Sequence, residues 1–198
     1  MTTTLGAAAG CLGTAAIGFV EKQYIDPGYV YNGVLAGLVS ITSPCAVVSP
    51  FGAIVVGLIG SLVYVGASKG VKAAGIDDAV DAFAVHGACG AWGVIACGLF
   101  ATPFYYSVSY YGDRKDDCAG LFYGGKASGS FAAAFACVFV ILAWVGSTMG
   151  ALFGTLKATG LLRVSQEIED AGLDDSKHGG AMSEVVAASV DGVKATEA

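Results

Sequence analysis

The chain has 198 residues, of which 55% are hydrophobic and 13% are charged, and its mean hydropathy is +0.68. This composition is too apolar for a soluble globular domain and is typical of a membrane protein. The formal charge of −6, without a cluster of Lys and Arg, argues against nucleic acid as a partner, because phosphate binding needs concentrated positive charge.

Charged residues divide the chain into apolar segments long enough for membrane helices, which need about 20 largely apolar residues each. We therefore predict an all-helical, polytopic membrane protein that crosses the lipid bilayer five times. The predicted spans are residues 2–20, 29–48, 51–68, 78–101 and 127–156.

Five crossings place the two termini on opposite sides of the membrane. Near-membrane positive charges are more numerous on the side of the carboxyl terminus, where they are Lys22, Lys69, Lys72, Lys157 and Arg163. The opposite side carries the long loop 102–126, whose three positive residues are matched by three acids. The positive-inside rule thus predicts a cytosolic carboxyl terminus and an external amino terminus.

The polarity of the chain changes after the last span, which predicts a membrane domain over residues 1–161 and a cytosolic tail over 162–198. Apolar side chains at helical spacing predict a short amphipathic helix over 165–171, ended by Gly172. Beyond residue 180 no sustained period exists, and we expect disorder there.

Glycines recur four residues apart in several spans, a spacing that brings membrane helices into close contact. The sets are Gly6 and Gly10, Gly33 and Gly37, and Gly146, Gly150 and Gly154. Chance spacing in a glycine-rich chain is the alternative. Six cysteines, without a CxxC pair, are interpreted as small buried residues, with three disulfides as the alternative reading of the even count.

The stretch DDAVDAFAVHGACGAWG, residues 77–93, contains ionisable groups inside an apolar span. Asp78 suits the N-cap of a helix, and Asp81 then falls in its first turn, where an acid stabilises unpaired amides. That structural role is one reading of Asp81. On a regular helix His86 would lie about 12 Å along the axis from Asp78.

An ionisable residue within a membrane span is a candidate functional residue, so His86 is predicted to act in transport. The alternative is a neutral imidazole that only packs against a neighbouring helix. Gly87 and Gly90 would let a helix or a narrow lumen approach it. The chain's other histidine, His178, lies in the tail, so no metal or other cofactor is expected, and without GxSxG or HExxH an enzyme is not expected.

The run DDAVDAFAVHGACGAWGVIACGLFA resembles the histidine-bearing helix of the ammonium transporter (Amt/Rh) family, especially its plant-type and bacterial branch. Further matching blocks are TTTLGAAAG, GVLAGLVSITSPCAVVSPFGAIVVGLIG and LLRVSQEIEDAGLDDSKHGG. Together they cover most of residues 2–180. A departure is Ser49, where many plant-type members carry Glu.

The resemblance implies a homotrimeric plasma-membrane channel for ammonium or ammonia, whose protomers have eleven helices in two inverted repeats and a final helix. His86 matches the second of two pore histidines, and Asp81 matches an acid five residues before it. The first half of the family pattern, with the partner histidine, is missing. We therefore expect a fragment of a longer transporter, or a half that pairs with a separately made first half.

Two other readings stay open: a membrane subunit that does not conduct and associates only through its glycine faces, and an intramembrane enzyme. The resemblance also implies that the tail contacts a neighbouring subunit. Ser176 matches a position where plant-type members carry a phosphorylatable Thr, and a phosphate there would add about −1.5 to −2 charges beside two acids and release the tail. The alternative is an ordinary solvated serine.

Overall fold

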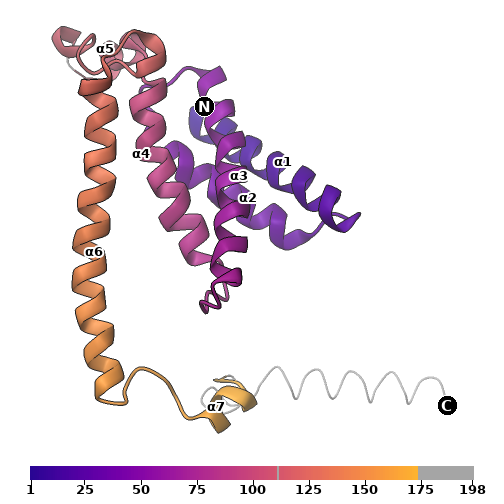
Figure 1. Ribbon diagram of the computed structural model, residues 1–198. Helices are drawn as coiled ribbons and strands as arrows, with labels where there is room; N and C mark the ends of the chain where they lie inside the picture. Colours follow the sequence, from indigo (N-terminus) through magenta and orange to yellow (C-terminus); the bar gives the residue numbers. More distant parts are fainter. Residues whose placement is uncertain (111, 174–198) are drawn as a thin grey trace. The chain divides into compact units, whose positions relative to one another are not determined.

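The computed structural model describes residues 1–110 and 112–173, and every regular element in those residues is a helix. The chain divides into two compact units, Met1–Leu142 and Ala143–Ala198. The helices are α1 (Thr2–Lys22), α2 (Pro27–Thr42), α3 (Pro50–Ala73), the π-helical turn η1 (Phe83–Ala88), α4 (Cys89–Phe100), α5 (Pro103–Ser109), the short turns η2 (Gly112–Arg114), η3 (Leu121–Tyr123) and η4 (Ala127–Phe131), α6 (Ala132–Ala158) and α7 (Gln166–Ala171) (Figure 1).

Within the described residues, the segments long and apolar enough to cross a membrane are Thr2–Lys22, Pro50–Ala73, Phe83–Phe100 and Gly129–Ala158. The all-helical membrane fold is confirmed, with four of the five predicted spans meeting this criterion. The exception is α2, which has 16 residues. At 1.5 Å per residue α2 is about 24 Å long, less than the hydrocarbon thickness of about 30 Å.

The predicted span 29–48 is too long at its carboxyl end, because α2 ends at Thr42. Pro44 has no N–H to donate to the carbonyl of Ser40, so the helical ladder stops there. The amides of Val47 and Val48 instead donate to the Pro44 carbonyl at 2.9 and 3.0 Å, which forms a turn before α3.

Three helices of the first unit begin in the same way, with a side-chain acceptor followed directly by proline. Asp26 precedes Pro27 and accepts from the Gly28 amide at 2.7 Å. Ser49 precedes Pro50 and accepts from the Gly52 amide at 3.0 Å, and Thr102 caps α5 ahead of Pro103. The acceptor satisfies an orphan amide, and proline at the first helical position needs no donor.

Glycines bring α1 and α2 into direct backbone contact. A Cβ added to Gly10 would lie 2.5 Å from the Gly33 carbonyl oxygen and 2.7 Å from the Gly37 Cα. A Cβ on Gly37 would lie 2.3 Å from the Gly6 carbonyl oxygen. The predicted helix contact through these glycines is confirmed, because no larger residue fits at the crossing.

The glycine triple of α6 behaves differently. A Cβ added to Gly146, Gly150 or Gly154 would meet no atom within 4 Å in the part of the chain that the structure describes. These glycines belong to the second unit, so the helix contact predicted for the triple stays a prediction. Spacing alone identifies a smooth helix face and does not supply its partner.

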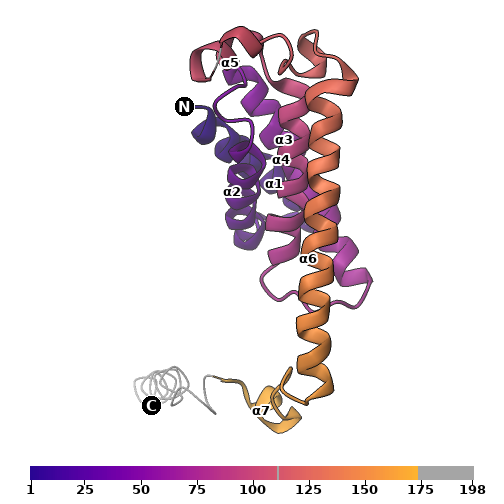
Figure 2. The ribbon, with the colours of Figure 1, turned by 90° about the vertical axis from the view of Figure 1, so that its left-hand side faces the viewer.

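Buried side chains of the first unit join the helices around η1 and α4, which Figures 1 and 2 show beside α3. One end of this core consists of Ala36, Tyr64, Val65, Ala84, Val85 and Cys89. The other consists of Ile41, Val48, Ala53, Val56 and Ala96. η1 contributes to the first end and α4 to both, so the buried face of this helix fixes the direction of its opposite face.

The second unit is described as far as residue 173 and contains the carboxyl-terminal part of α6 and the short helix α7. The amphipathic helix predicted over 165–171 is confirmed, with Ser165 before its first residue and Gly172 after its last. Gly172 has φ 87°, a conformation that favours glycine and ends the helix. The disorder predicted after residue 180 lies outside the described residues.

Candidate functional site

Asp78 caps the start of the helix that carries His86, but this helix starts later than the sequence predicts. The carboxylate oxygens of Asp78 accept hydrogen bonds from the amides of Ala82 at 2.7 Å and Phe83 at 2.9 Å. Residues 79–81 form a turn, and Asp81 has φ 55°, in the left-handed region. The prediction that Asp81 lies in the first helical turn is therefore wrong, because the turn rotates it out of the helix.

The Asp81 carboxylate faces α3 and is held there by several donors. The Ser68 hydroxyl donates to Oδ1 at 2.7 Å, and the Tyr64 hydroxyl donates to Oδ2 at 2.9 Å. The ammonium of Lys72 lies 3.3 Å from Oδ1, and the Asp81 side chain is 14% exposed. A half-buried carboxylate is thus paired with a cation and hydrogen-bonded at both oxygens, as a charge away from water requires.

α2 joins this network through Asn32. Its amide nitrogen donates to the Tyr64 hydroxyl at 2.9 Å and lies 3.5 Å from Asp81 Oδ2. The Lys72 ammonium also donates to the Ser68 hydroxyl at 3.0 Å. The network therefore ties α2, α3 and the turn before η1 together, and a cavity of about 170 Å³ opens beside it.

Asp81 precedes the membrane-spanning segment Phe83–Phe100. Burial acts to raise the pKa of its carboxyl, but the hydrogen bonds from Ser68 and Tyr64 and the charge of Lys72 outweigh burial. The net result is a pKa below the ordinary value of 3.8. Asp81 is consequently a charged, fully engaged anchor at neutral pH.

His86 lies on the opposite side of the same helix. Ala84, Val85 and Cys89 are buried against the core, whereas His86, Phe83 and Gly87 form an exposed face. Phe83 is 55% exposed, and the His86 imidazole has no hydrogen-bond partner within residues 1–110 and 112–173. The ring is therefore free to meet a group that these residues do not supply.

The backbone at His86 is a π-helical turn. The Cys89 amide donates to the Ala84 carbonyl five residues earlier. Such wide turns are rare and occur mainly at functional sites. His86 is the fourth residue of Phe83–Phe100, so it lies about 4.5 Å along the axis from the first residue of that segment. The predicted distance of about 12 Å from Asp78 along a regular helix is wrong, because residues 79–81 are not helical.

The structure does not bring the predicted site residues together. Asp81 contacts α2 and α3, and His86 faces outward from η1. The sequence prediction missed Asn32, Tyr64, Ser68 and Lys72 as partners of Asp81. A signal existed for the last three, because polar residues at positions 64, 68 and 72 share one face of a helix. No pattern indicated the π-helical turn.

Two other aspects of the predicted site concern metal ions and the tail. Among residues 1–110 and 112–173, no three His, Cys, Asp or Glu side chains are grouped to hold a metal ion. Gly172 is placed at the end of α7, whereas Ser176 lies outside the described residues. The all-helical fold and the four described helices long and apolar enough to cross a membrane define a multi-pass membrane protein.

Comparisons with known proteins identify the family. The family model described as Ammonium Transporter Family matches residues 1–183, and the chain belongs to that family. It is 43% identical over 185 residues to Ammonium transporter 1 member 2 of Arabidopsis thaliana, covering 91% of this chain and 34% of the relative. Ammonium transporter 1 member 1 of the same plant is 40% identical, with 91% and 36% covered. The chain thus spans about a third of the length of these relatives.

Solved structures show the same fold. A structure described as Sensor Amt Protein matches with a TM-score of 0.74 and 26% identity, covering 89% of this chain and 40% of that chain. The crystal structure of Saccharomyces cerevisiae Mep2 matches with a TM-score of 0.72 and 24% identity, covering 82% of this chain and 38% of that chain. The arrangement of helices is therefore that of part of a longer helical fold.

Proposed function

We propose that the chain takes part in the movement of ammonium or ammonia across a membrane and that His86 lines the path. The observation that carries this proposal is an exposed imidazole without a partner among the described residues, on a membrane-spanning segment. Membership of the ammonium transporter family and the names of its plant relatives support the choice of substrate.

The physical chemistry of the substrate suits a histidine. A bare ammonium ion entering an apolar lumen loses its hydration at a cost of many kcal/mol, whereas ammonia carries no charge. A neutral imidazole donates one hydrogen bond and accepts another, and it gains or loses a proton near neutral pH. His86 therefore offers a polar contact to ammonia and a route for a proton.

The exposed face of η1 needs a covering surface before it encloses a path. Phe83, His86 and Gly87 form one wall of the proposed path. The plant relatives are about three times as long as the matched segment. We propose that segments corresponding to the remainder of those relatives supply the opposite wall.

Asp81 has a supporting role in this proposal. Its bonds to Tyr64, Ser68 and Lys72 hold the turn before η1 against α3. Because η1 starts two residues later, the anchor fixes the direction in which His86 points. Asp81 acts in transport as a positioning residue rather than as a contact of the substrate.

The test uses a chimera in which this chain replaces the matching segment of Ammonium transporter 1 member 2 of Arabidopsis thaliana. Uptake of radiolabelled methylammonium is measured in yeast cells that lack their own ammonium uptake. His86→Ala is expected to reduce uptake or change its dependence on pH, because the polar contact in the path is lost. Asp116→Asn, which changes an exposed side chain in the loop 102–126, is the control.

Two outcomes contradict the proposal. Uptake and pH dependence unchanged by His86→Ala, at equal protein levels, would remove His86 from the path. A chimera that reaches the membrane and assembles but takes up nothing would instead favour the subunit that associates without conducting.

The proposal extends to assembly, location and regulation. A homotrimer in the plasma membrane is expected, and blue native electrophoresis with fluorescence microscopy of the chimera tests both. The tail, from Gly172 past Ser176, is proposed to regulate transport through a neighbouring subunit. Uptake that is the same for Ser176→Asp and Ser176→Ala would leave Ser176 without that role.

A further inference from the structure

Two cysteines of the first unit line the same cavity. Cys97 lies near the carboxyl end of α4, and Cys118 lies in the connection between η2 and η3. A cavity of about 280 Å³ has both thiols in its wall, together with Ser43, Val47 and Tyr106. Both cysteines are half-buried and free, so two reduced thiols border the same open cavity.

The backbone beyond Cys118 packs directly on the end of α4. The Gly120 amide donates to the Ala101 carbonyl at 2.7 Å. A Cβ added to Gly120 would lie 2.5 Å from the Leu99 carbonyl oxygen, so only glycine permits this approach. Position 120 is therefore fixed against residues 99–101, one helical turn after Cys97.

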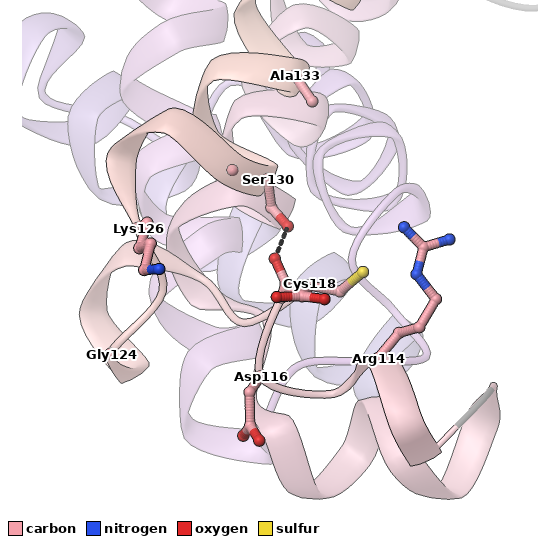
Figure 3. A pocket seen from close by; sticks show the side chains of 9 residues that line it. Arg114, Asp116, Cys118, Gly124, Lys126, Ser130 and Ala133 are labelled. Atoms are coloured by element: carbon pink, nitrogen blue, oxygen red, sulfur yellow. Dashed lines mark hydrogen bonds between the residues drawn. The ribbon is translucent and has the colours of Figure 1, made fainter.

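The backbone before Cys118 is fixed to the same stretch of α4 by a separate contact. The Ser130 hydroxyl lies 3.5 Å from the Asp117 carbonyl oxygen, its acceptor (Figure 3). A Cβ on Gly98 would lie 3.1 Å from the Ser130 carbonyl oxygen. Ser130 thus connects the neighbour of Cys118 to the neighbour of Cys97, and both flanks of Cys118 meet the end of α4.

Cys118 is also reached from a second, larger cavity of about 580 Å³, which is lined by charged side chains. Figure 3 shows Cys118 between Arg114 on one side and Lys126 on the other. The neighbouring Cys118 thiol, together with burial, raises the pKa of the Tyr106 phenol. Cys118 therefore borders both cavities, whereas Cys97 borders the smaller one.

We propose that Cys97 and Cys118 form a disulfide when the protein meets a peroxide. In the first step a thiol attacks the peroxide, the O–O bond breaks, and a sulfenic acid and one water form. In the second step the other thiol attacks the sulfenic sulfur, the S–O bond breaks, and the S–S bond forms with release of a second water. Two thiols are oxidised and hydrogen peroxide is reduced.

The cross-link has a defined structural effect. It closes a loop over residues 98–117. It also fastens the connection between α5 and η3 to α4. The positive-inside count predicts that the loop 102–126 is external, and disulfides persist in such an oxidising environment. The link is a covalent site separate from the exposed face of His86 and does not depend on transport.

The test treats the purified chain in detergent with hydrogen peroxide and follows its thiols. Free thiols are expected to fall from the six in the sequence to four. Chymotrypsin produces peptides 93–100 and 112–122, each with a single cysteine, and a non-reduced digest is expected to contain them joined. Reduction with dithiothreitol separates them.

Serine variants identify the pair. Cys97→Ser and Cys118→Ser are each expected to abolish the joined peptides, whereas Cys137→Ser, at an exposed position of α6, leaves them unchanged. Circular dichroism verifies that the variants keep their helices. The proposal is overturned if all six thiols persist, if Cys118 joins Cys45, or if Cys118 becomes a sulfinic acid while Cys97 stays reduced.

Discussion

At the scale of single residues, the two ionisable groups five positions apart have opposite surroundings. Asp81 has a left-handed backbone and a carboxylate bonded to Ser68 and Tyr64 and paired with Lys72. His86 is exposed and has no hydrogen-bond partner within the described ranges. The acid therefore holds the turn against α3, whereas the imidazole is the residue for which a role in transport is proposed.

The Asp81→Asn substitution is expected to lower the thermal unfolding midpoint of the detergent-solubilised chain. Asparagine tolerates the left-handed conformation, so the change removes the charge and one of the two accepting oxygens without straining the backbone. Hydrogen bonds to charged groups contribute about 1.5–3 kcal/mol, which sets the expected loss of unfolding free energy. Asp81→Ala should cost more, because alanine is strained at φ 55°.

The matched control for this change is Asp116→Asn, which alters an exposed carboxylate in the loop. Its midpoint should stay close to that of the unchanged chain, since exposed charges contribute little. Equal midpoints for Asp81→Asn and Asp116→Asn would show that the network does not stabilise the fold.

The contribution of Asp81 should also depend on pH in a defined direction. Its pKa is lowered in the folded chain, so the unfolded chain takes up its proton first as the pH falls. The stabilisation is complete above the unfolded value near 3.8 and is lost as the pH falls through the folded value. The midpoint difference between the unchanged chain and Asp81→Asn should be constant from pH 7 to about 5 and shrink below about 4.

Thermal unfolding across that range measures this difference directly. At each pH the measurement compares two chains that differ in one side chain. The effect of the other carboxyl groups on the midpoint therefore cancels to first order. A difference that shrinks already between pH 7 and 5 would assign the pH dependence to another group.

At the scale of helices, glycine spacing has opposite outcomes in different places. Gly10 fits between Gly33 and Gly37 with no room for a methyl group, whereas nothing lies within 4 Å of a Cβ on Gly150 in the described chain. The four-residue spacing thus marks a tight contact between α1 and α2, whereas within the described part of its own unit the α6 triple meets no neighbour. Helix contacts depend on which faces meet, and spacing describes only one face.

Gly10→Ala is therefore expected to destabilise the chain. The new methyl group would overlap backbone atoms of α2, and overpacking of this kind costs about 1–3 kcal/mol. Gly150→Ala is the matched control and should be neutral or slightly stabilising, because alanine favours a helix more than glycine does. Thermal unfolding in the same detergent compares the two, and equal effects would contradict the close crossing of α1 and α2.

At the scale of the whole molecule, the helix that carries His86 has a face that the described residues leave exposed. Phe83 is 55% exposed beside His86, whereas Ala84 in the same turn is fully buried. The plant relatives continue well beyond the matched segment, which covers 34% of one of them. We propose that segments corresponding to that additional length cover the exposed face.

Cysteine labelling tests this expectation. In the isolated chain, Phe83→Cys should react readily with a water-soluble maleimide, and Ala84→Cys should not, because only the first position is exposed. In the chimera with the plant transporter, labelling at position 83 should fall as the opposite wall covers it. Mass spectrometry of the labelled peptide measures both, and unchanged labelling in the chimera would mean that the face stays open.

The sequence by itself determined the helical membrane class, the family and the residues worth testing. Apolar length and charge position are properties of single segments, so they predicted the helices from composition. The caps of α2 and α3, with Asp26 and Ser49 before proline, are equally local. His86 could be selected as a candidate because an ionisable residue within an apolar span is exceptional.

Only the tertiary structure decided what these residues face. The left-handed turn at Asp81 directs its carboxylate toward hydrogen-bond donors on α2 and α3. These bonds join residues up to 49 positions apart in the sequence. The π-helical turn at His86 and the proximity of Cys97 to Cys118 likewise depend on packing. Local patterns give the polarity of a helix face, but its partners are set by how several helices share one core.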